Sequence, residues 1–89
     1  MLSVERTHRF KKDFKLMLKR GKSAEKLRQI VSQLASKKPL ETKHRDHTLT
    51  GNFSDSRECH IEPDWLLIYT PLEEAIRLER TGTHSDLFR

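Results

Sequence analysis

Three histidines in the second half of the chain have the side-chain chemistry for acid–base catalysis near neutral pH. They are His47, His60 and His84. Histidine titrates close to physiological pH, so one ring can accept a proton while another donates one. This chemistry suits RNA cleavage, because RNA supplies its own nucleophile in the 2′-hydroxyl group. Such a reaction requires no metal ion or cofactor, and we expect none here.

Carboxylates accompany the central histidine. If residues 57–62 form a strand, Glu58, His60 and Glu62 alternate onto one face, and Asp64 lies at the adjacent turn. We expect the two glutamates to point with His60 into a groove on the face of the sheet that the helices leave free. The sequence therefore predicts a mixed imidazole and carboxylate cluster.

Two arginines, Arg57 and Arg80, are predicted to reach the same groove. An arginine can hold a phosphate through two hydrogen bonds and can stabilise charge that develops in a transition state. Strict alternation, however, places Arg80 on the side of Ile76 and Leu78. If those two residues are core, Arg80 needs a bulge or a strand-end twist to face the groove. Both arginines also suit ordinary cross-strand pairs with glutamates.

The histidines also have purely structural interpretations. His60 can be an ordinary exposed strand residue, His84 can cap the last turn, and His8 and His44 are expected at the surface. Phe88 is different, because packing poorly explains an aromatic ring in a short terminal tail.

A zinc site is a further alternative, because His44 and His47 are three residues apart and His60 and His84 could join them. Structural zinc sites usually contain cysteine, and Cys59 is the only cysteine of the chain. Nothing in the spacing requires a metal, so no metal site is predicted.

Length and composition predict one small basic domain that spans residues 1–89. Hydrophobic residues make up 34% of the chain and charged residues 35%, which allows one modest core. Eighteen lysines and arginines against thirteen acidic residues give a net charge of +5, which favours polyanionic partners. A membrane span needs roughly 18–20 apolar residues, and no run approaches that length. With no signal-peptide core at the N-terminus, a cytoplasmic location is expected.

The first half of the chain is predicted to form two amphipathic helices. Thr7 is a suitable N-cap for apolar residues that recur at helical spacing over residues 10–18. Gly21 lies where such a helix ends, and Ser23 is the N-cap candidate for a second helix over residues 24–34. Two helices joined by a tight turn are therefore expected.

The second half is predicted to form strands over residues 57–62, 65–69 and 75–81. A polar connection over residues 37–52 precedes them, and a short N-terminal strand over residues 2–5 is weakly patterned. The apolar run from Trp65 to Tyr69 is typical of a central strand, so both aromatic residues are expected in the core. These elements predict an α+β fold, a small twisted antiparallel sheet with the two N-terminal helices packed on one face.

Three segments of the chain resemble the YafQ-type toxins, which belong to the RelE/ParE superfamily of bacterial toxin–antitoxin systems. The segments are Arg45–Gly51, Cys59–Tyr69 and Arg77–His84. The resemblance extends essentially end to end; the last two segments are its specific part and the helical half is generic. The family fold is a small twisted sheet with two N-terminal helices on one face, which agrees with the pattern above.

The resemblance implies a toxin that enters the ribosomal A site and cuts mRNA by attack of the 2′-hydroxyl. The products would be a cyclic phosphate and a 5′-hydroxyl. It also implies a cognate antitoxin protein that masks the toxin, in a complex that represses its own operon by binding operator DNA. The function expected from the resemblance is thus a ribosome-dependent, metal-independent endoribonuclease, or mRNA interferase, with no role at a membrane.

By position, the resemblance implies catalytic roles for five residues: His47, His60, Asp64, Arg80 and His84. His84 would be the general acid and Arg80 would hold the phosphate. Which of the other three acts as the base stays open.

Three further residues are expected to contact RNA. Phe88 matches a terminal aromatic residue of the family, and Arg57 and Glu58 lie beside the catalytic set. Two positions depart from the family pattern. Glu58 stands where an aspartate is expected, and Thr48 follows His47 where a proline is common.

Two other functions remain open from the sequence. ParE-type relatives of the same fold are non-catalytic inhibitors that bind DNA gyrase, and a plain basic RNA- or ribosome-binding module would also carry this charge. The grouping of histidines and arginines favours cleavage, because an inhibitor has no use for such a groove.

Overall fold

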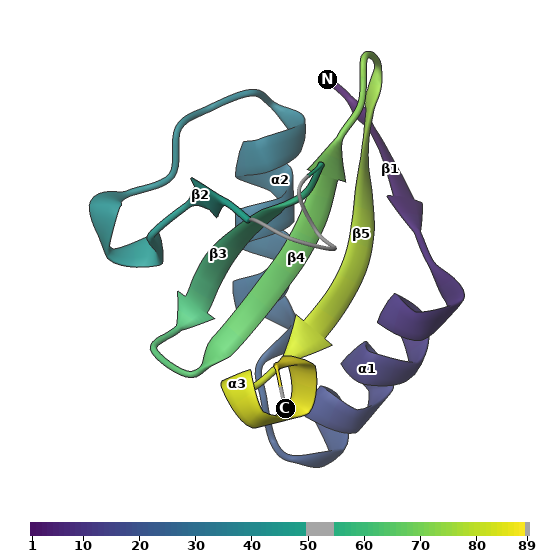
Figure 1. Ribbon diagram of the computed structural model, residues 1–89, viewed down its shortest axis with the longest axis vertical. Helices are drawn as coiled ribbons and strands as arrows, with labels where there is room; N and C mark the ends of the chain where they lie inside the picture. Colours follow the sequence, from purple (N-terminus) through teal and green to yellow (C-terminus); the bar gives the residue numbers. More distant parts are fainter. Residues whose placement is uncertain (50–54, 89) are drawn as a thin grey trace.

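The computed structural model describes residues 1–49 and 55–88 (Figure 1). Along the chain its elements are β1 (Ser3–Arg6), α1 (His8–Lys19), α2 (Ala24–Ala35), the 3-10 turn η1 (Thr42–His44), β2 (His47–Thr48), β3 (Arg57–Glu62), β4 (Trp65–Pro71), β5 (Ala75–Gly82) and α3 (His84–Leu87). The predicted α+β class and the two N-terminal helices are confirmed. Thr50 and Gly51, which end the first of the three family-like segments, lie outside the described residues.

The two long helices begin at the caps that the sequence predicts. The Thr7 side chain accepts a hydrogen bond from the backbone N–H of Phe10, and the Ser23 side chain accepts one from Lys26. Each bond satisfies one of the N–H groups that a helix start leaves without a partner. Gly21, between the helices, has a φ of +88°, a conformation that side chains disfavour.

The five strands form one sheet in the order β1-β5-β4-β3-β2. Neighbouring strands from β2 to β5 are antiparallel, but β1 runs parallel to β5. The sheet is therefore mixed, where the sequence predicts an antiparallel one. A parallel pair requires a long crossover connection, and here most of the chain, including both long helices, separates β1 from β5.

Three short elements occur where the sequence predicts only connections or a tail. The turn η1 and the strand β2 lie within the polar segment, and α3 follows β5 directly (Figure 1). The signal for α3 is present in the sequence, because Thr83 and Asp86 have the spacing of a capping box.

One face of the sheet carries the hydrophobic core. Apolar residues of α1 and α2 pack there against alternate residues of β3, β4 and β5, and Trp65 and Tyr69 lie among them as expected. The Trp65 indole N–H donates to the Thr81 hydroxyl, so the polar end of the ring is satisfied inside the core. No helix within the described residues is long and apolar enough to cross a membrane.

An irregularity at the end of β3 changes the direction of one predicted groove residue. His60 pairs with Leu66 on β4, but the next pair is Glu62 with Trp65, so one residue of β3 is passed over. Glu62 therefore follows Trp65 onto the helix face and accepts hydrogen bonds from Lys22 and Lys26. The prediction that Glu62 points into the groove with His60 is wrong, because alternation stops at this bulge.

A second irregularity, in β5, provides the bulge that Arg80 requires. Tyr69 pairs with Leu78 and Ile68 pairs with Arg80, which leaves Glu79 as the extra residue. The shift by one residue puts Arg80 opposite Ile68, on the sheet face away from the helical core. Leu78 keeps its place in the core.

Candidate active site

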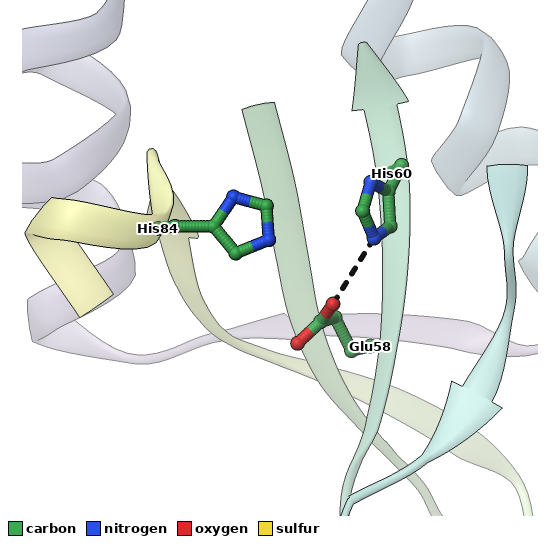
Figure 2. A group of neighbouring side chains, drawn as sticks. All are labelled: Glu58, His60 and His84. Carbon is green, nitrogen blue, oxygen red and sulfur yellow. Dashed lines mark ion pairs between the residues drawn. The ribbon is translucent and has the colours of Figure 1, made fainter. Parts of the chain in front are cut away.

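Three side chains converge on the sheet face that the helices leave free (Figure 2). One ligand atom from each of Glu58, His60 and His84 lies within 4.8 Å of the other two. The His60 Nε2 atom is 3.2 Å from Glu58 Oε1, and the two imidazole centroids are 5.6 Å apart. Glu58 and His60 are buried, whereas His84 is half exposed. Glu58 and His60 thus form a side of the cluster that is shielded from water, and His84 forms a side that a ligand can reach.

Local structure explains why these side chains meet. Glu58 and His60 are two residues apart on β3, so they share one face, and their partners on β4 are Ile68 and Leu66. His84 begins α3 immediately after β5, and β5 lies on the far side of β4 from β3. The central strand therefore sets the spacing between the two histidines.

Asp64 orients His84. Its Oδ1 atom accepts hydrogen bonds from His84 Nδ1 at 2.6 Å and from the His84 backbone N–H at 2.9 Å. The backbone N–H and then the ring of His84 hold the pKa of Asp64 below its usual value. With Nδ1 donating to a carboxylate, Nε2 is the atom left to exchange a proton with a ligand.

His60 lies between two acceptors. Its Nδ1 atom is 3.2 Å from the carbonyl oxygen of Pro63, and its Nε2 atom faces the Glu58 carboxylate. The ring can donate to both groups only when both nitrogens carry a proton. The His60 carbonyl oxygen is in turn 2.7 Å from Nδ1 of His44. His44, which the sequence places at the surface, is half-buried and supports β3 through this contact.

His47 lies at the outer side of Glu58. It pairs with Glu58 across β2 and β3, and its Nε2 atom is 3.8 Å from Glu58 Oε1. Its Nδ1 atom donates to the carbonyl oxygen of Arg45 at 2.6 Å, which fixes the ring. Half of the His47 side chain is exposed. The structure thus brings His47 to the edge of the cluster, next to Glu58.

Arg57 is not brought into the cluster. It pairs with Tyr69 across β3 and β4, and this register places it on the face of Cys59 and the helical core. Its Nε atom is 3.1 Å from Asp46 Oδ1, which also accepts a 2.6 Å hydrogen bond from the Tyr69 hydroxyl. Burial, together with this bond, raises the pKa of Tyr69. Arg57 thus anchors the connection before β2 to the sheet.

Arg80 is held by an aspartate that the sequence does not suggest. Its Nε atom is 2.7 Å and one Nη atom 3.2 Å from the carboxylate of Asp13 on α1, and this contact raises the pKa of Arg80. Asp13 also accepts from the backbone N–H of Thr81. Arg80 lines an open groove with Thr70 and Glu79 on the free face of the sheet. No local pattern marks Asp13, because its partner lies 67 residues away along the chain.

Phe88 follows α3, and its backbone N–H donates to the carbonyl oxygen of His84 at 2.8 Å. Phe88 as a residue is 42% exposed, which leaves apolar surface one helical turn from the cluster. His8, by contrast, is exposed at the start of α1, which agrees with its expected surface position.

Comparison with known proteins decides the family. The family model described as "Bacterial toxin of type II toxin-antitoxin system, YafQ" matches residues 2–89. The mRNA interferase toxin YafQ of Escherichia coli strain K12 is 41% identical over 86 residues, which cover 96% of this chain and 94% of that protein. This chain belongs to the YafQ family. The resemblance that the three sequence segments predict is confirmed.

Two solved toxin structures share the fold closely. The crystal structure of the E. coli DinJ–YafQ complex has a TM-score of 0.91 and 39% identity, with 100% of both chains covered. A copper-bound mutant toxin from Helicobacter pylori has a TM-score of 0.94 and 38% identity, with 99% of this chain and 100% of that chain covered. The overall fold described above is thus that of solved toxins.

The site of this YafQ-family chain can donate and accept protons on two sides of one ligand. His84, oriented by Asp64, has its Nε2 atom left for proton exchange, while the Glu58 carboxylate, held by His60, offers an acceptor. An acid and a base that face each other across a gap are what a displacement at phosphorus requires.

Proposed function

We propose that the chain is the toxin of a type II toxin–antitoxin system and that it cleaves mRNA through attack of the RNA 2′-hydroxyl on the adjacent phosphate. The observation that carries this proposal is the oriented imidazole of His84 opposite the buried Glu58–His60 pair, with one ligand atom of each within 4.8 Å. The name of the E. coli relative, mRNA interferase toxin, supports mRNA as the substrate.

His84 is the general acid in this scheme. Its Nε2 proton passes to the 5′-oxygen as the bond between phosphorus and that oxygen breaks. Asp64 acts through His84, because its carboxylate already accepts two hydrogen bonds from that residue. Asp64 therefore fixes the tautomer and stabilises the ring when it is protonated, and it is a positioning residue and not the base.

Glu58 is the proton acceptor. Its carboxylate takes the proton of the 2′-hydroxyl as the new bond to phosphorus forms, and the products are a 2′,3′-cyclic phosphate and a 5′-hydroxyl. His60 holds Glu58 through the 3.2 Å contact, and His47 lies 3.8 Å from the same oxygen. Glu58 lies between His47 and His60, and we therefore assign the acceptor role to its carboxylate and not to either imidazole.

Arg80 and Phe88 bind the RNA in this scheme. The β5 bulge puts Arg80 on the free face of the sheet, where its permanent charge can stabilise the phosphate as negative charge develops. The exposed ring of Phe88 offers a surface on which a base can stack. Arg57, bound to Asp46, has a structural role instead.

The proposed setting is the cytoplasmic ribosome. The net charge of +5 favours docking on ribosomal RNA at the A site, where the mRNA codon is exposed. The E. coli relative forms a complex with DinJ, and a cognate antitoxin that neutralises this chain and binds operator DNA in the complex follows by analogy.

Mapping of mRNA 5′ ends after induction of the toxin tests the function. We expect new ends in frame with codons in translating cells, and none in naked mRNA incubated with the protein. An absence of new ends together with altered DNA supercoiling would instead identify a gyrase inhibitor of the ParE type. Strong binding to ribosomes without new mRNA ends would identify an RNA-binding protein that does not cleave.

We infer in addition that the cluster binds a divalent transition metal that inhibits cleavage. Two imidazoles and a carboxylate suit Cu²⁺ and Zn²⁺, and Glu58, His60 and His84 can each supply one ligand atom with little rearrangement. A copper-bound relative supports this fit. A bound metal would occupy the nitrogen and oxygen lone pairs that proton transfer needs. It would therefore inhibit the metal-free cleavage that the sequence predicts.

Calorimetric titration of the purified protein with CuCl₂ or ZnCl₂ tests the metal site. We expect binding of about one ion per chain, and His84→Ala should weaken it by about tenfold or more, because a ligand is lost. His8→Ala, which removes an exposed histidine, should bind like the wild type. Saturating metal should suppress cleavage, and treatment of the toxin with EDTA, which is removed before ribosomes are added, should restore it. Equal metal affinity in wild type and His84→Ala would contradict the assignment.

A further inference from the structure

The helix that carries His84 depends on polar contacts for its position. α3 has four residues and none of them is buried. A single helical turn has little stability of its own, so its surroundings must hold it. Asp86, at its third position, accepts hydrogen bonds from both Nη atoms of Arg20, at 2.8 and 3.4 Å. Arg20 lies at the C-terminal end of α1.

Asp86 joins this contact to the cap of α3. Its Oδ2 atom also accepts from the backbone N–H of Thr83 at 2.9 Å, which completes the capping box. Asp86 packs so closely on Gly82 that a Cβ atom at position 82 would lie 3.0 Å from the Asp86 Cβ atom. The Arg20 guanidinium, followed by the Thr83 N–H, lowers the pKa of Asp86 to about 2.

A matching contact holds the turn that carries Asp64. Glu62, two residues before Asp64, binds Lys22 with one carboxylate oxygen at 2.8 Å and Lys26 with the other at 2.9 Å. The two lysines lower the pKa of Glu62. Lys22 lies between α1 and α2, and Lys26 lies in the first turn of α2.

We propose that the α1–α2 junction, residues 20–26, is a positioning element that holds α3 and the β3–β4 turn in the placement that lets Asp64 reach His84. Figure 1 shows the junction beneath α3, at the same end of the molecule as the β3–β4 turn. The side chains of Asp64 and His84 are themselves largely exposed, so burial does not bring them together. The consequence for catalysis rests on the proposed role of His84 as the acid.

The ion pairs of the junction fit a positioning role. Arg20, Lys22 and Lys26 meet two carboxylates that lie partly buried, with side chains 21% and 25% exposed. Exposed ion pairs contribute little stability to a whole protein. We therefore expect the ion pairs of the junction to affect the placement of α3 more than the free energy of unfolding of the whole protein.

Arg20→Gln tests the proposal, because glutamine keeps much of the length of the side chain and removes its charge. We expect kcat for cleavage in the ribosome assay to fall by about tenfold while KM stays within about twofold, since the acid is displaced and the RNA contacts stay. Arg20→Lys, which keeps the charge, should recover most of kcat. Arg28→Gln is the matched control, because Arg28 on α2 is exposed and its ion pair among the described residues is a 3.7 Å contact with Glu25.

The NMR signals of α3 give a readout that does not depend on activity. In Arg20→Gln we expect the His84 ring signals to shift and the backbone N–H of Phe88, which donates to His84 in the wild type, to exchange faster with solvent. Unchanged signals and unchanged kcat would overturn the proposal. A loss of activity with unchanged α3 signals would also overturn it, and a raised KM would then assign Arg20 to RNA binding. If His84→Ala itself retains cleavage, the proposed role of His84 as the general acid fails, and the NMR result still decides the anchor.

The pH dependence of the same signals provides a second test. A carboxylate whose pKa is lower in the folded state stabilises the fold above its unfolded value near 3.8 and loses this contribution as pH falls through about 2. We therefore expect the Phe88 N–H of the wild type to keep its protection factor, its exchange rate relative to an unfolded peptide at the same pH, from pH 7 to about pH 4. In Asp86→Asn this protection should fall to the level of Arg20→Gln already at pH 7. Wild-type signals in Asp86→Asn at pH 7 would overturn the anchor.

Discussion

Replacement of His84 by alanine is expected to lower kcat for mRNA cleavage by about 10²–10⁴-fold, the usual contribution of a general acid. The leaving 5′-oxygen would then depart without a proton, and growth arrest by the toxin should disappear. Folding should be preserved, because α3 buries no side chain and the ring of His84 is half exposed. Single-turnover cleavage of ribosome-bound mRNA measures the rate, and circular dichroism checks the fold.

Two companion variants make the His84 result specific. Asp64→Asn should also lower kcat, by no more than His84→Ala does, because the amide still contacts the ring but no longer stabilises its protonated form. The double variant should be no worse than His84→Ala alone, since Asp64 acts through His84. His8→Ala, at an exposed position on α1, should cleave like the wild type. Retained toxicity of His84→Ala would remove His84 from the mechanism.

Glu58→Gln is expected to lower kcat by about 100-fold or more, because the amide cannot accept the proton of the 2′-hydroxyl. Glutamine has nearly the volume of glutamate, and its oxygen can still accept the hydrogen bond from His60, so the buried site should keep its shape. The same single-turnover assay measures the loss. Glu58→Asp, which keeps a carboxylate but shortens its arm, should retain more activity than Glu58→Gln.

A matched control separates catalysis from loss of charge. Glu41→Gln removes one carboxylate from an exposed position on the connection after α2, and we expect it to cleave within about twofold of the wild type. A loss of less than about fivefold in Glu58→Gln would contradict Glu58 as the acceptor. His60 would then be the candidate base, with Glu58 as its positioning partner.

The periodicity of the sequence predicts much of the scaffold and part of the site. Caps at Thr7 and Ser23 mark the helix starts, because their chemistry is local to one turn. Alternation on β3 correctly puts Glu58 and His60 on one face, since successive side chains of a strand must point to opposite sides. The motif around His84 predicts the family of the chain and a functional role for His84. The family is confirmed.

Alternation fails where the strands pair irregularly. Glu62 turns to the helix face at the end of β3, and Arg80 turns to the free face after the bulge in β5. One passed-over residue reverses the direction of every side chain after it, and nothing in the local pattern marks where the partner strand causes the shift. Arg57 follows its register with Tyr69, so it faces away from the groove that the sequence predicts it to reach.

The sequence by itself determined the α+β class, the two helices and the aromatic core, and it marked the histidines as candidates for acid–base chemistry. Only the tertiary structure decided which residues those histidines contact. Asp64 meets His84 across 20 residues, Arg20 meets Asp86 across 66 and Asp13 meets Arg80 across 67. Short-range patterns report backbone preference and burial, whereas the partner of a charged side chain depends on which distant elements the fold brings together.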